Sequence, residues 1–362
     1  ASLTIAGNVA LATHGETVQE VLGGGNASRA YQQFTLRQPP VTYVRDRQAA
    51  SGVRSTLAVR VNDLLWTEVP SFYGRAADER VYVTRLNDEG KTVVQFGDGI
   101  HGARVPTGQE NVRATYRKGT GVAGNVRTGQ LSTLLTRPLG LKGGANPQAA
   151  TGGDDPEPRD AARENAPLTT LTLERVVSLR DYQDFARAYA GIAKALATWS
   201  WDGQRRGVLI TVAGPGGAPV QPDVIELLLG ATRLAGDPFV PLRVLTYRAA
   251  RFNVAYKVKT DPRYEQGAVH EATVDSLRAR FAFETRQFGQ PVVLSDVIAT
   301  IQAVPGVIAV DVDALARTDG IGGTGLENVL PAALPQAGSL TASHAAELLI
   351  LAPDPVVPGE MA

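Results

Sequence analysis

The chain has 362 residues, of which 43% are apolar and 20% are charged, a balance typical of a folded globular protein. Lys plus Arg and Asp plus Glu both number 36, so the net charge is zero, which argues against a general nucleic-acid binder. The absence of cysteine excludes disulfide frameworks, thiolate zinc sites and cysteine nucleophiles. The longest apolar runs are far shorter than the roughly 20 residues that cross a bilayer, so we expect no membrane insertion.

Period-2 patterns predict a β-rich domain over residues 1–137. Apolar side chains alternate with small or polar ones over residues 57–62. The segments 80–86 and 91–96 flank a turn at 87–90, as the strands of a hairpin do. We expect this domain to be truncated at its N-terminus, because the chain starts without methionine.

Residues 138–167 are crowded with Gly, Pro, Asp and Asn, which predicts a linker or long loop at a domain boundary. Asp154, Asp155 and Glu157 lie in this segment. A catalytic pair of carboxylates needs a surrounding that holds it in place and shifts its pKa values, and the neighbouring residues offer none. We therefore interpret the three acids as part of a solvated loop.

Helical and strand patterns then alternate, which predicts two small α+β units at residues 168–250 and 251–315, each with helices packed on a short sheet. The fold class is thus α+β, with a β-rich N-terminal domain before the two units. Beyond them, residues 316–362 form a Gly/Ala/Pro-rich tail with one helix near residues 342–351. The helices of the two units are expected to begin near Asp181, Asp223, Gly267 and Asp296.

The end of the second unit is the most regular pattern in the chain. Ser295 is the expected N-cap of its last helix, and Gly306 is the expected turn glycine between that helix and the strand that follows. Val297, Ile298 and Ile301 share one face of the helix. Their expected partners are Ile308, Val310 and Val312, which alternate along the strand.

Gly97, Gly99 and Gly102 match the G-x-G-x-x-G pattern of a dinucleotide-binding loop. Such a loop must open a helix and be followed about 20 residues later by an acid, and neither condition is met. Pro106 and Gly108 follow the pattern and lead to another strand. We interpret the glycines as structural turn residues in which Asp98 and the glycines adopt positive φ, and we expect no cofactor.

No other pattern indicates chemistry. His14, His101, His270 and His344 are scattered without metal-ligand spacing, and no serine lies in a nucleophile elbow. We therefore expect no catalytic residue and no metal ligand. Trp199 and Trp201 are two apart, so in a strand they point to the same side. Core packing explains such a pair, and so does a partner interface.

Three blocks in order resemble the baseplate J-like family, the wedge proteins of contractile phage tails and of bacterial contractile injection systems. They are FGDGIHGARVPTGQENVRATYRKGTGVAGNV from Phe96, RVVSLRDYQDFARAYAGIAKA from Arg175, and FGQPVVLSDVIATIQAVPGVIAVDVDAL from Phe288. The resemblance extends from about residue 80 to residue 315 and leaves most of the two ends uncovered.

The resemblance implies a structural subunit of a baseplate ring, usually six-fold, that links the central hub and spike to the tube and sheath and rearranges on contraction. It implies as partners other wedge subunits, further copies of this chain, hub or spike proteins and sheath proteins. It implies assembly in the cytoplasm, within a phage tail or a related particle. The family has no catalytic residues to carry over.

The residues are also compatible with two other functions. One is a β-rich ligand-binding or tail-fibre-like adhesion protein with an attached α+β module. The other is an enzyme, for example a carbohydrate-active one that uses the carboxylates of residues 138–167. Because only 6% of the residues are aromatic, exposed sugar-binding platforms are not indicated.

Overall fold

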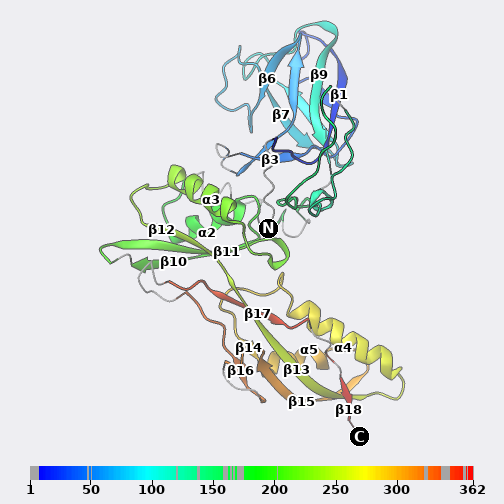
Figure 1. Cartoon of the computed structure of the whole chain (residues 1–362), viewed down its shortest axis with the longest axis vertical. Coiled ribbons are helices and arrows are strands. Elements are labelled where there is room, and N and C mark those ends of the chain that lie inside the picture. The colour runs from blue at the N-terminus through cyan, green and yellow to red at the C-terminus, as the bar shows by residue number, and fades with distance from the viewer. Residues whose placement is uncertain are drawn as a thin grey trace. The chain divides into compact units, whose positions relative to one another are not determined.

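The computed structural model describes residues 8–46, 49, 51–119, 121–136, 139–157, 162–163, 165, 168, 175–201, 203–321, 325–335, 343–353, 356 and 358–361. The chain forms two compact bodies (Figure 1). The N-terminal body contains Ala1–Ala49 and Val53–Pro158, and the C-terminal body contains Ala50–Gly52 and Arg159–Ala362. The break at residue 158 falls inside the predicted segment 138–167. Sheets dominate the first body and sheets with helices the second, so the predicted α+β class is confirmed.

The N-terminal body is built around a seven-stranded sheet of order β1-β9-β5-β6-β7-β8-β2. Neighbouring strands are antiparallel except for the parallel pair β6 and β7. Its strands are β1 Glu16–Gly25, β2 Gln33–Thr35, β5 Ala58–Val61, β6 Leu64–Glu68, β7 Val81–Leu86, β8 Thr92–Phe96 and β9 Gly108–Lys118. A small hairpin of β3 Tyr43–Arg45 and β4 Val53–Ser55 and the 3-10 turn η1 Val122–Gly124 complete it.

The core of this body is formed by the inward-facing apolar side chains of its alternating strands. Val59 and Phe96 are fully buried, and the Phe96 ring meets the ring of Trp66 edge-on at 5.1 Å between centroids. The buried Tyr82 hydroxyl donates a hydrogen bond to the carbonyl of Leu57. The predicted hairpin is confirmed, since β7 and β8 pair antiparallel across the turn that begins at Asn87.

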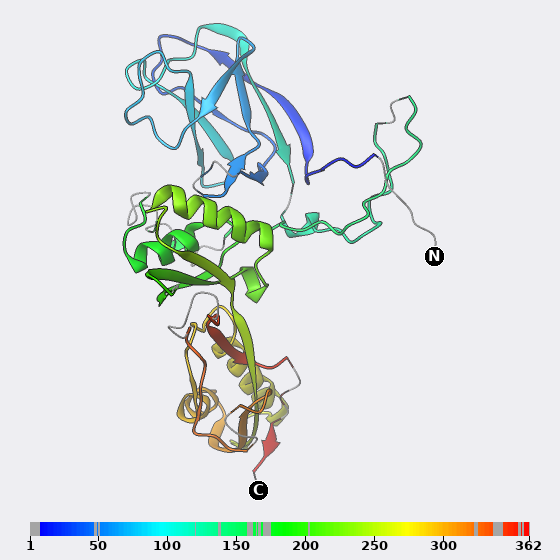
Figure 2. The same cartoon turned by 60° about the vertical axis from the view of Figure 1, so that its left-hand side comes forward.

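The first α+β unit packs two helices on one face of a three-stranded sheet, as Figure 2 shows. The order is β10-β11-β12, with β10 antiparallel and β12 parallel to β11. The Ser178 hydroxyl caps the first helix by accepting from the Asp181 amide at 3.2 Å, and the Asp181 carboxylate accepts from the Ser178 amide at 2.8 Å. The elements are α2 Leu179–Ala188, β10 Lys194–Trp201, β11 Arg206–Ala213, η2 Pro215–Gly217, α3 Pro222–Ala235 and β12 Leu242–Thr246.

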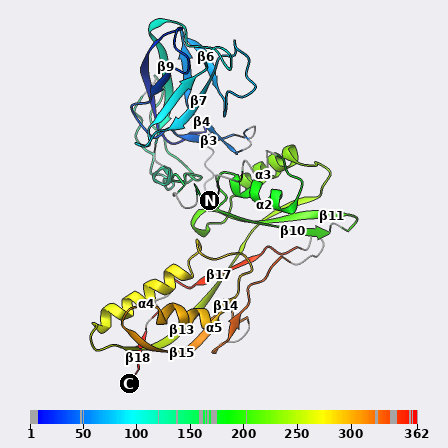
Figure 3. The ribbon, with the colours of Figure 1, turned by 180° about the vertical axis from the view of Figure 1, so that it is seen from behind.

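The second α+β unit packs α4 and α5 against a sheet of order β15-β13-β17, with β18 paired to β13 (Figure 3). Val297 and Ile301 of α5 are fully buried in its core, as predicted. Ile308 is 52% exposed, contrary to the prediction, because the register with β13 shifts between Val307 and Ala309, so that Val307 packs against the core and Ile308 does not. The elements are β13 Arg248–Thr260, α4 Gln266–Arg280, β14 Val292–Val293, α5 Leu294–Gln302, β15 Val307–Arg317, β16 Val329–Leu330, β17 Glu347–Leu351 and β18 Gly359–Glu360.

Two predictions for the end of the chain are wrong. Helix α5 begins at Leu294 with Val293 as its N-cap and without a side-chain cap, so Ser295 does not cap it. The helix expected near residues 342–351 is the strand β17, and Ala342 itself lies outside the described residues. The apolar run of β17 does not alternate because Leu348 and Leu349 pack into two different clusters, one on each side of the strand. The predicted tail thus supplies three strands to the second unit.

Candidate interaction surface

The end of β10 exposes both tryptophans. Trp199 is 38% exposed and Trp201 is 50% exposed, although Ala195 and Ala197 earlier in the same strand are buried. Alternation in a strand places all four side chains on the same face of the sheet. Since Ala195 and Ala197 belong to the core beneath the helices, the tryptophans continue that face beyond the part that the core covers.

Arg206 completes a cation–aromatic pair on this face. It lies opposite Trp201 in the register of β10 and β11, and its guanidinium carbon is 3.7 Å from the centroid of the Trp199 ring. Within the described part of the chain, the side chain of Arg206 makes no hydrogen bond or ion pair. Its N–H groups therefore remain free to donate to an acceptor from outside the chain, while the ring holds the guanidinium plane in position.

The loop before β12 adds an exposed aromatic side chain at the same end of the sheet. The Val208 amide, opposite Trp199 in the register, donates to the carbonyl of Pro241 at 2.8 Å. Phe239 in this loop is 77% exposed. We name these four residues the tryptophan edge: Trp199, Trp201, Arg206 and Phe239.

The glycine pattern in the N-terminal body forms a turn organised by Asp98. Its carboxylate accepts from the amides of His101 and Ile100 at 2.6 and 2.8 Å and from the Tyr31 hydroxyl at 2.8 Å. The backbone hydrogen bonds from His101 and Ile100 hold the pKa of Asp98 well below its usual range. The negative charge therefore serves the turn itself.

The three glycines are required for two different reasons. Gly99 and Gly102 have φ values of +85° and +87°, which a side chain disfavours. Gly97 and Asp98 do not have positive φ, contrary to the prediction. At Gly97 the reason is close approach, since an added Cβ would clash with the carbonyl oxygen of Gly102. The turn leads to the strand β9, and no helix begins between residues 97 and 108.

The other candidates for chemistry are dispersed or serve local structure. Asp155 accepts from the Val122 amide at 3.0 Å, so it holds a loop together, where the sequence indicated no contact. Over the described residues, no group of three His, Asp or Glu side chains is placed to hold a metal ion. None of the described helices has the length and apolar character needed to cross a membrane. Gly306 has a φ of +95° at the turn between α5 and β15.

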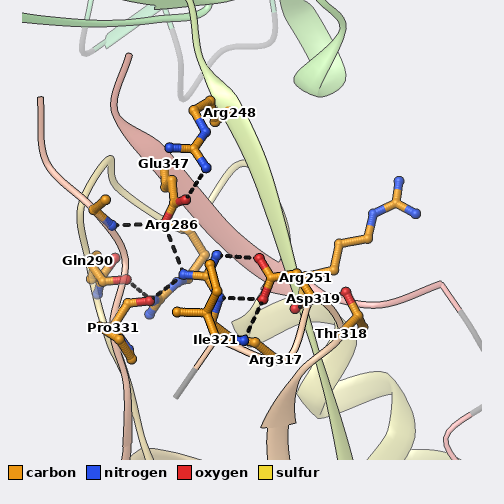
Figure 4. Close-up of polar contacts among 11 residues, drawn as sticks. Arg248, Arg251, Arg286, Gln290, Arg317, Thr318, Asp319, Ile321, Pro331 and Glu347 are labelled. Atoms are coloured by element: carbon orange, nitrogen blue, oxygen red, sulfur yellow. Dashed lines mark hydrogen bonds and ion pairs between the residues drawn. The ribbon is translucent and has the colours of Figure 1, made fainter. Parts of the chain in front are cut away.

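One buried charged group was missed by the sequence analysis. Arg317 and Glu347 are 4% and 3% exposed, and their side chains form an ion pair of 2.9 Å (Figure 4). Arg286 is 2% exposed and donates to the carbonyls of Leu349, Gln290 and Pro291. Burial lowers the pKa of Arg286, with a smaller contribution from Arg280. The only signal in the sequence is Glu347 itself, a lone acid before an apolar run.

Comparisons with known proteins identify the unit that carries the tryptophan edge. Residues 174–245 match the family model described as the baseplate J-like central domain. Residues 174–245 are thus similar to a baseplate J-like central domain. The resemblance inferred from the sequence is thereby confirmed, and the matched residues contain α2, α3 and the sheet of β10, β11 and most of β12.

Solved structures show a weaker likeness. One match is the cryo-EM structure of the anti-feeding prophage (AFP) baseplate, six-fold symmetrised, at 13% identity and a TM-score of 0.36. It covers 96% of this chain and 76% of that chain. No curated protein matches the chain significantly.

Proposed function

We propose that the chain is a structural baseplate subunit of a contractile injection system or phage tail. In this proposal it occupies the wedge, joins the central hub and spike to the tube and sheath, and rearranges when the sheath contracts. The observation that carries the proposal is the match of residues 174–245 to the baseplate J-like central domain. A role in assembly rather than in catalysis agrees with the local use of the candidate acids, since Asp98 and Asp155 accept backbone hydrogen bonds.

The tryptophan edge is the surface through which we propose that the central domain contacts a neighbouring subunit. Exposed tryptophan and arginine side chains are the residue types that contribute most at protein interfaces. The free N–H groups of Arg206 fit a carboxylate, so the neighbour is expected to bring an acidic side chain next to an apolar one. Other wedge subunits, further copies of this chain and the hub or sheath proteins are the candidates.

A double substitution tests the contact surface. Trp199→Ala with Trp201→Ala should leave the chain folded, because both rings are substantially exposed. Particles purified from cells that express the variant should lack a complete baseplate in electron micrographs. Arg206→Glu should act in the same direction, since it places a negative charge opposite the expected carboxylate. Tyr73→Ala is the matched control, because Tyr73 is 93% exposed in the N-terminal body.

Two results would count against the proposal at different levels. If the tryptophan variants assemble at the wild-type yield, the edge is not a contact surface, and the baseplate role is unaffected. If electron microscopy of the wild-type particle places this chain outside a ring beneath the sheath, the baseplate role itself is wrong.

A further inference from the structure

The two α+β units are joined by the chain at one point and are bridged back by the C-terminal segment. Strand β12 ends at Thr246 and β13 begins at Arg248, so a single residue separates the sheets of the two units. Figure 1 shows β13 leaving the first unit and running into the second. The segment from Ser343 to Leu348 then returns to the first unit. We name residues 343–348 the strap.

The strap contacts the first unit at three places. The Ser343 hydroxyl lies 3.3 Å from the Ser200 hydroxyl of β10. The amide of Ala346 donates to the Thr211 hydroxyl of β11 at 3.1 Å, and both residues are fully buried. Leu348 packs in a small cluster with Ala213 of β11 and Phe283. Each contact crosses from one unit to the other.

The strap is fixed to the second unit by the pairing of Glu347 and Leu348 with β13 and by the carboxylate of Glu347 (Figure 4). One oxygen lies 2.9 Å from Arg317 and accepts the Ala333 amide at 2.9 Å. The other lies 3.1 Å from Arg248, the first residue after the junction. A carboxylate as deeply buried as this one is stable only while such partners satisfy it.

Arg317 and Arg248 keep other favourable surroundings when their contacts with the Glu347 carboxylate are lost. Arg317 also forms a two-pronged pair with Asp319 at 3.0 and 2.6 Å and donates to the Pro331 carbonyl at 2.7 Å. The side chain of Arg248 is 52% exposed, so water can solvate it. Loss of Glu347 therefore leaves no buried cation without a partner. This lowers the penalty that normally follows when one member of a buried pair is removed.

The strap places no side chain in either main apolar core. The apolar clusters of the first and second units contain none of residues 343–348, and Leu348 belongs only to the small cluster at the junction. Leu349, the residue after the strap, is the first residue of β17 that belongs to the core of the second unit. The bridge that the strap makes between the two units can thus open, at its contacts to either unit, while both cores stay packed.

We propose that the strap is a clasp that fixes the two α+β units in one arrangement, with Glu347 as its point of release. When it opens, both units stay folded and turn relative to each other about the β12–β13 junction. The proposal concerns this chain alone and does not depend on the baseplate role.

Distance measurements between the two units test the clasp in the full chain. Because the sequence has no cysteine, spin labels can be attached specifically at Glu226→Cys on α3 and Glu271→Cys on α4, both exposed. Pulsed electron-spin measurements should give one narrow distance in the otherwise unchanged chain. Glu347→Gln removes the charge, and Thr211→Val removes the acceptor of the Ala346 amide. Either variant should broaden the distribution and add a second distance.

A surface ion pair supplies the control. Lys257 and Asp313 form an exposed pair of 2.7 Å in the second unit, so Asp313→Asn changes a similar charge without touching the strap. It should leave the distance distribution narrow. An unchanged narrow distance in folded Glu347→Gln and Thr211→Val would overturn the proposal. Unfolding of a whole unit in either variant, seen by circular dichroism, would overturn it as well, because the clasp must open without loss of the cores.

Discussion

The two α+β units have similar parts but are completed in different ways. In the first unit, α2, α3 and the sheet of β10, β11 and β12 come from one continuous stretch, residues 179–246. The second unit needs β17, which follows β15 by 30 residues from Arg317 to Glu347 and pairs in parallel with β13. A unit whose strands and helices all lie close together in sequence is specified by local sequence patterns. A unit that needs a strand from a distant part of the sequence depends on contacts that local patterns do not contain.

The largest effect should come from a charge in the core of the second unit. Ile301→Asp places a carboxylate where the side chain is fully buried, and this should lower the free energy of unfolding by several kcal/mol, on the order of 4. Urea titration with a fluorescent dye on Glu271→Cys should show the second unit unfolded or nearly so. A dye on Glu226→Cys reports on the first unit in the same titration.

The conservative change Ile301→Val is the control and should cost only about 0.5–1.5 kcal/mol. If Ile301→Asp unfolds at the same urea concentration as the unchanged chain, Ile301 cannot lie in a core. The register of α5 on the sheet would then be wrong.

The dependence on distant chain can be tested at β17 itself. Leu349 is fully buried in the core of the second unit, so Leu349→Ala should lower its free energy of unfolding by about 2–5 kcal/mol. The dye on α4 reports this loss. Leu326→Ala is the matched control, because Leu326 is 50% exposed and should change stability by less than about 0.5 kcal/mol. Equal effects of the two changes would show that the second unit does not need β17.

The sequence predicted the elements that are specified by local patterns and missed those that depend on distant residues. The helices of both units and the burial of Val297 and Ile301 followed from spacings of three and four residues. Strand β17 could not be predicted, because a run that is buried on both sides looks the same as a buried helix. The missed cap at Ser295 has a similar cause. Pairing of Val292 and Val293 with β16 sets where α5 begins, and this pairing is invisible in the local pattern.

The candidate surface was predictable in its two tryptophans but not in Arg206 or Phe239. The spacing of Trp199 and Trp201 placed them on one face, whereas their exposure depends on where the helices stop covering the sheet. Arg206 was not singled out, because its place over Trp199 arises from the hairpin register. The ionic group of Glu347 joins segments that are 30 and 99 residues apart in sequence, so no local signal could place it.

Acid should destabilise the second unit through Glu347 and Asp319. Burial raises the pKa of Glu347, but the hydrogen bonds from Arg317 and the Ala333 amide outweigh it, so its pKa lies below the ordinary value. Arg317 likewise lowers the pKa of Asp319. For groups with lowered pKa values, the stabilisation is complete above the ordinary pKa and is lost as the pH falls through the folded one. Arg317, whose own pKa is raised by Asp319 and Glu347, stays charged throughout this range.

The measurement compares the free energy of unfolding of the second unit, from the dye on α4, between pH 7 and the acid range. Glu347→Gln should reduce the loss of stability on acidification, because the variant no longer has this carboxylate to protonate. A loss of the same size in both proteins would contradict a role of Glu347 in the acid sensitivity.

The smallest expected effect concerns the N-caps of α2 in the first unit and of α5 in the second. Ser178 caps α2 with a reciprocal pair of hydrogen bonds to Asp181, so Ser178→Ala should lower the stability of the first unit by about 1 kcal/mol. Ser295 occupies the second position of α5 and makes no capping bond, so Ser295→Ala should change the second unit by less than about 0.5 kcal/mol. Because both changes remove one hydroxyl, each is the control for the other. Two equal losses would mean that α5 also uses its serine as a cap, and that pairing with β16 does not set where that helix begins.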